Sequence, residues 1–165
     1  MEPRRFFFII ALIVSFAQTS FISIPFLGFA PYLSACMSQD SLRLLLWRAF
    51  FLGLITDLFS TSFFFGSTGI IFMIISALLY KQKGWFFNDK IYTLSILTFC
   101  FSFSYTSIIH LMFYLQKLPL ELSIQSIGSE FIFTPLLDAL YAFVLFTLPE
   151  SFYELIMRRK FAFKN

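Results

Sequence analysis

The stretch that decides the fold is IYTLSILTFCFSFSYTSIIHLMFYL, which occupies residues 91–115. Apolar and aromatic side chains fill most of it, and His110 is its one acidic or basic residue. With a rise of about 1.5 Å per residue, an α-helix of this length exceeds the roughly 30 Å of hydrocarbon in a bilayer. The stretch therefore predicts a transmembrane helix.

Further apolar segments along the chain share this character. Long ones, each with about the 17–25 residues that a membrane crossing requires, occupy 6–24, 42–60, 62–80 and 130–148. A weaker segment, 25–39, begins with Pro25, Gly28 and Pro31, which break a helix start. As a straight helix it would reach only about 22 Å. We expect it to be short, kinked or partly re-entrant, and shielded by its neighbours.

We therefore predict an all-α membrane protein, a six-helix transmembrane bundle that forms a single domain over residues 1–165. Hydrophobic residues make up 59% of the chain and charged residues 13%. Soluble domains average roughly 45–50% and about 25%, so the surplus is explained by solvation in lipid. The 27 phenylalanines include the runs 6–8 and 63–65, which we expect to face lipid.

Basic residues lie in short clusters between the apolar segments, which is typical of orientation signals and not of nucleic-acid binding. If Arg4 and Arg5 are cytoplasmic, six crossings also place Arg43, the cluster 81–90 and the basic tail 150–165 in the cytoplasm. Lys117 is then left outside. Five crossings would put the two termini on opposite sides. The positive-inside bias favours six crossings with both termini cytoplasmic.

Ionisable residues inside spans cost a few kcal/mol unless they have partners, so each is a candidate for function. Arg48 is expected either to extend toward the cytoplasmic interface or to pair with Asp138. Asp138 lies near the middle of the last segment and needs a partner more urgently. His110 and Glu130 are expected near the outer surface, on the same level as Asp57.

Gly53 precedes Asp57 by four residues, so the two share a helix face. A glycine there lets another backbone approach closely. Gly66 and Gly69 give the next segment a surface that also lacks side chains at these positions. We expect a tight helix–helix contact in which Asp57 caps the next helix near Ser62. The functional alternative is a contact to a partner's helix or to a lipid-linked ligand.

Enzymatic motifs are missing from the sequence. It contains no G-x-S-x-G, H-E-x-x-H, Walker or G-x-G-x-x-G pattern. Cys36 and Cys100 are expected to be small apolar side chains, and a lone His110 is weak evidence for a metal site or a proton-linked role. We predict no catalytic residues, no metal and no cofactor.

The stretch from Phe50 to Ser60, with its core Gly-Leu-Ile-Thr-Asp-Leu at 53–58 and the following Gly66 and Gly69, resembles the rod shape-determining protein MreD family. Pro31-Tyr32-Leu33 resembles the family's Pro-Asp-Leu element, although a tyrosine replaces the acid. Thr134-Pro135-Leu136-Leu137 and the basic tail resemble the family's final span and end.

This resemblance implies a bacterial inner-membrane scaffold of the elongasome, which works beside MreC, the MreB filament and the wall-synthesis enzymes. It also implies a fold like the substrate-binding subunits of energy-coupling-factor transporters. The competing hypothesis is a transporter subunit that binds a small, vitamin-type solute. Its pocket would be lined by Asp57, His110 and Glu130.

Overall fold

The computed structural model describes residues 3–21, 27–59, 65–82, 93–115 and 128–149. Within these ranges every regular element is a helix, which confirms the predicted all-α class for that part of the chain. The first helices are α1 (Pro3–Phe21), α2 (Ala30–Gln39), α3 (Leu42–Phe59), α4 (Ser67–Lys81) and α6 (Thr93–Leu115). The last helix is continuous and consists of the π-helical turn η1 (Ser129–Phe133), α8 (Thr134–Ala142) and the π-helical turn η2 (Phe143–Thr147).

Two of the described helices are long and apolar enough to cross a membrane, judged by length and composition: α6 and the stretch Glu130–Thr147. Both lie where the sequence predicts spans. The number of crossings stays a prediction. The helix expected over 62–80 begins only at Ser67. Gly66 explains the later start, because its φ of 94° is left-handed and does not belong to a right-handed helix.

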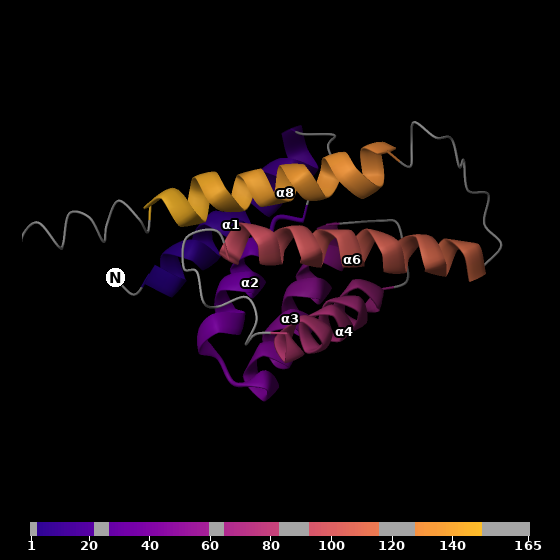
Figure 1. The fold of residues 1–165 in the computed structure, drawn as a ribbon, viewed down its shortest axis with the longest axis horizontal. Helices are drawn as coiled ribbons and strands as arrows, with labels where there is room; N and C mark the ends of the chain where they lie inside the picture. The colour runs from indigo at the N-terminus through magenta and orange to yellow at the C-terminus, as the bar shows by residue number, and fades with distance from the viewer. Residues whose placement is uncertain (1–2, 22–26, 60–64, 83–92, 116–127, 150–165) are drawn as a thin grey trace, which may run out of the picture.

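The short second segment lies at the centre of the structure. α2 has 10 residues, about 15 Å of helix, and contacts α1, α3, α4, α6 and α8. From Ala30 to Met37 its side chains are buried or half-buried. In Figure 1, α6 and α8 run side by side, while α3 and α4 pack together as a hairpin. Neighbouring helices shield the short helix, as the sequence predicts.

Aromatic rings join the helices in the core. Phe72 of α4 packs edge-on against Phe101 of α6, with ring centroids 5.3 Å apart. Phe7 of α1 packs against Phe146 of η2 at 5.0 Å, and Phe8 against Tyr32 at 5.5 Å. The prediction that the first phenylalanine run faces lipid is therefore wrong for Phe7 and Phe8, because the helix turns them toward α2 and the last helix.

The outward faces of the bundle are apolar. In α4, Ile70, Ile74 and Leu78 follow one another at intervals of four residues and are exposed. Exposed large apolar side chains also occur on α1, α3, α6 and the last helix, whereas α2 exposes none in its described part. Soluble monomers rarely expose apolar patches beyond a few hundred Å². Several polar side chains of the described residues are instead buried, among them Ser102 and Asp138.

Candidate functional site

The glycines of α3 and α4 bring the two helix backbones into direct contact. A Cβ added to Gly53 would lie 2.4 Å from the Cα of Gly69 and 2.5 Å from its backbone nitrogen. A Cβ on Gly69 would lie 3.0 Å from the backbone oxygen of Phe50. No side chain fits between these backbones, so Gly53 and Gly69 form the predicted close-packed contact. We call it the glycine seam.

Asp57 closes the end of this seam that lies at the start of α4. Its Oδ2 accepts a hydrogen bond from the backbone N–H of Gly66 at 2.7 Å and another from Thr68 at 3.3 Å. These N–H groups belong to the first turn of α4 and have no partner within the helix. The prediction that Asp57 caps the next helix is confirmed, with the cap at Gly66 and Thr68. Ser62 lies outside the described residues.

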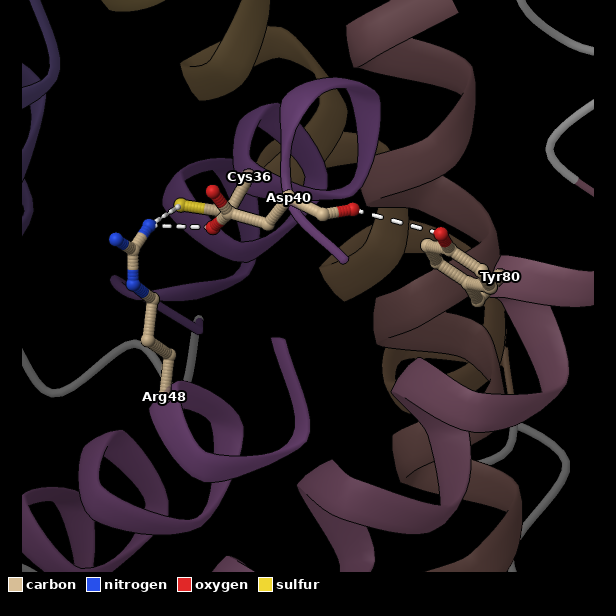
Figure 2. A network of polar contacts seen from close by, with 4 residues as sticks. All are labelled: Cys36, Asp40, Arg48 and Tyr80. Carbon is tan, nitrogen blue, oxygen red and sulfur yellow. Dashed lines mark hydrogen bonds and ion pairs between the residues drawn. The ribbon is translucent and has the colours of Figure 1, made fainter. Parts of the chain in front are cut away.

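Arg48 joins α3 to the end of α2 and does not pair with Asp138. Its Nη1 forms an ion pair with the Asp40 carboxylate and also donates to Cys36 Sγ at 3.4 Å. Tyr80 of α4 donates its hydroxyl to the backbone oxygen of Asp40 at 3.5 Å. In Figure 2, Arg48 approaches Cys36 and the Asp40 carboxylate from one side, and Tyr80 reaches the backbone oxygen of Asp40 from the other.

Sequence reasoning missed Asp40 and treated Cys36 as apolar. Asp40 is the C-terminal cap residue of α2 and is buried. It therefore provides the Arg48 guanidinium with an ion-pair partner inside the protein. The clue in the sequence was that Asp40 precedes Arg48 by eight residues, with the break between two helices in between. That signal becomes useful only once the end of α2 is known. The contact of Arg48 with Cys36 could not be expected from composition.

Asp138 is fully buried and holds the chain that leads into α2. Its Oδ1 accepts from the backbone N–H of Leu27 at 3.0 Å, and the Ser102 hydroxyl of α6 donates to its Oδ2. One turn further on, Tyr141 donates to the backbone oxygen of Gly28 at 3.3 Å. We call Asp138 and Tyr141 the clasp. The clasp provides hydrogen-bond partners for backbone groups outside the helices. Such groups are costly in free energy when they are away from water without a partner.

His110 and Glu130 meet near the ends of α6 and η1. The His110 Nε2 lies 2.8 Å from the Glu130 Oε2, and the His110 ring stacks on Phe131 with centroids 4.7 Å apart. The predicted proximity of these two residues is therefore found. Asp57 bonds to α4 and to neither of them. No group of three potential metal ligands occurs in the described ranges.

The four polar clusters share one chemical role: each ties two or more segments together. The cap joins α3 to α4, the Arg48 pair joins α2 to α3, the clasp joins the last helix to 27–28, and His110 joins α6 to η1. Comparison of the chain with protein-family models, with curated proteins and with solved structures gives no match. The site must therefore be interpreted from its own geometry.

Proposed function

We propose that this chain is a non-enzymatic, multi-pass scaffold of the bacterial inner membrane that acts in cell-shape determination and peptidoglycan synthesis. One observation carries the proposal. The residues that resemble the MreD family, Gly53, Asp57, Gly66 and Gly69, are those that build the glycine seam and its cap. The resemblance thus falls on a structural device that fixes one helix hairpin.

The distribution of apolar surface supports the membrane location. Leu58 of α3 is 70% exposed, Leu115 of α6 is 69% exposed and Ile132 of η1 is 64% exposed. Side chains of this size on several separate helices favour lipid as the surrounding solvent. Multi-pass topology with cytoplasmic termini and a partner similar to MreC belong to the same proposal.

The polar contacts favour a scaffold over the solute-binding alternative. Asp57 directs its carboxylate oxygen at two backbone amides of α4. His110 and Glu130 pair with each other. The three residues expected to line a solute pocket therefore make contacts within the protein, and a pocket built on them would first have to break those contacts.

Depletion of the protein in its own bacterium tests the function. We expect rounded cells or disturbed wall synthesis, together with co-purification of wall-elongation proteins in mild detergent. Complementation with Gly53→Ala should fail at normal expression, because the seam has no room for a methyl group. Gly128→Ala is the matched control, since nothing lies within 4 Å of its new Cβ.

Two results would contradict the scaffold. Depleted cells that keep their shape and their rate of wall synthesis would be one. The other is a purified protein that binds a small solute and loses this binding with Asp57→Ala, while the variant leaves cell morphology intact.

The topology has a separate test, because a cytoplasm-active reporter fused after Lys83 should be active. An inactive reporter would contradict the prediction of six membrane crossings.

A further inference from the structure

One end of the α3–α4 hairpin carries exposed positive charge. Arg43 lies at the start of α3 and Lys81 at the end of α4, and both are exposed. The antiparallel hairpin puts them at the same end, where Tyr80 reaches the backbone of Asp40. Neither cation forms an ion pair within the described part of the chain, whereas Arg48 is already paired with Asp40. Among the described residues, no carboxylate therefore offsets the positive charge of Arg43 and Lys81 at this end.

Exposed aromatic rings continue from Arg43 along the same face of α3. Trp47 and Phe51 follow at intervals of four residues, and each is 56% exposed. Their rings stack with centroids 5.9 Å apart and an interplanar angle of 26°. A guanidinium, an indole and a phenyl group thus succeed one another over about 12 Å of helix. We call this face the α3 stripe.

The order of these groups matches the order of groups in a phospholipid. A phosphate sits at the membrane surface, the glycerol region lies below it, and acyl chains follow. Tryptophan is enriched at the glycerol level, and arginine binds phosphate with several donors. With Arg43 at the level of the phosphate, Trp47 would lie about 6 Å deeper along the helix and Phe51 about 12 Å deeper.

We propose that the α3 stripe and Lys81 bind an anionic phospholipid, with Arg43 and Lys81 on its phosphate and Trp47 and Phe51 against its glycerol and acyl chain. The inference rests on the proposed membrane location. Each basic residue near an anionic membrane surface strengthens binding about fivefold at physiological salt. Neutralising both cations should therefore weaken the preference for anionic lipid by about 25-fold at most.

Tryptophan fluorescence offers a direct measurement. The chain has two tryptophans, so Trp85→Phe leaves Trp47 as the sole reporter. The full-length protein is placed in nanodiscs that contain a fixed share of brominated phosphatidylglycerol or of brominated phosphatidylcholine. We expect phosphatidylglycerol to quench Trp47 more strongly at equal mole fraction. Adding Arg43→Gln and Lys81→Gln should remove the difference, and Lys117→Gln, which removes one charge elsewhere, should keep it.

The outcomes separate this inference from the proposed function. Equal quenching by the two lipids would overturn the phospholipid site and leave the membrane location standing. Quenching by neither lipid would overturn the membrane location as well. If the double variant misfolds, raising salt on the Trp85→Phe protein replaces it, because screening should shrink a preference that depends on charge. A preference that survives 1 M salt would exclude the two cations as its cause.

Discussion

Two helix pairs in this protein are held together by opposite means. In the α3–α4 hairpin, Gly53 and Gly69 have no side chains, so the backbones touch. Between α6 and the last helix, contact is made through polar side chains, namely Ser102 with Asp138 and His110 with Glu130. The helices of the first pair are close neighbours in sequence, whereas residues 116–127 separate the helices of the second pair.

If the proposed membrane location holds, the difference bears on how helices associate when their surroundings are as apolar as their surfaces. In lipid the hydrophobic effect does not drive one helix against another, so close packing and interhelical hydrogen bonds must do so. Close packing dominates the hairpin, where Asp57 adds hydrogen bonds only at the start of α4, whereas side-chain hydrogen bonds join α6 to the last helix. Close packing should be sensitive to an added methyl group, whereas hydrogen bonding should be sensitive to the loss of a donor or acceptor.

The largest effect is expected at the clasp. Asp138→Ala removes the acceptor of the Leu27 N–H in a fully buried position. A buried group left without a partner costs about 1–3 kcal/mol, and the small side chain adds a cavity. The free energy of unfolding in mixed micelles should fall accordingly. Asp138→Asn keeps a carbonyl acceptor and should lose less, so equal losses for the two variants would contradict the hydrogen-bond explanation.

The glycine seam should respond to the addition of a single methyl group. Gly53→Ala places a Cβ against the backbone of Gly69, which has no flexible end that can move aside. Overpacking of this kind costs about 1–3 kcal/mol. The same unfolding assay on Gly128→Ala should stay within about 0.5 kcal/mol of the native protein. A stable Gly53→Ala protein would show that the helices are not in backbone contact.

Loss of the α4 cap should have a moderate effect. Asp57→Ala leaves the N–H groups of Gly66 and Thr68 without their side-chain acceptor. Removing such a cap costs about 0.5–2 kcal/mol. Hydrogen exchange at the first turn of α4 should speed up more than exchange at its last turn. Uniform acceleration over the whole helix would point to global unfolding and against a local cap.

The smallest effect is expected for His110 and Glu130. Their contact is partly exposed, with 48% of the Glu130 side chain accessible. Exposed pairs contribute about 0–1 kcal/mol. A double-mutant cycle with His110→Phe and Glu130→Gln should therefore give a coupling energy below about 1 kcal/mol. A larger coupling would make this pair, and not Ser102 with Asp138, the main polar link between α6 and the last helix.

Local features of the fold were predictable from the sequence. The helices, the short second segment and the cap by Asp57 follow from patterns within a few residues of one another. Gly53 and Gly69 lie close in sequence, so a turn between them brings them together without distant information. The start of α4 at Ser67 was missed, because an apolar pattern does not reveal that Gly66 is left-handed.

Contacts between distant segments were not predictable. Asp138 was correctly expected to need a partner, yet that partner, the Leu27 N–H, lies 111 residues away. No periodicity joins two such positions, and charge pairing suggested Arg48 instead. The backbone amide carries no charge, so charge-based reasoning overlooks it. The π-helical turns that flank α8 were hidden for a similar reason, since an apolar run predicts one regular helix.

The clasp has a consequence for the order in which the protein assembles. The side chains that hold residues 27 and 28 are 111 and 113 residues further on in the sequence. A ribosome must therefore add 111 residues after Leu27 before the entrance to α2 gains its bond to Asp138. Newly made amino-terminal segments must wait in an incomplete arrangement until the carboxyl-terminal helix arrives. Chains cut short before residue 138 should accordingly be recognised and degraded by quality-control proteases.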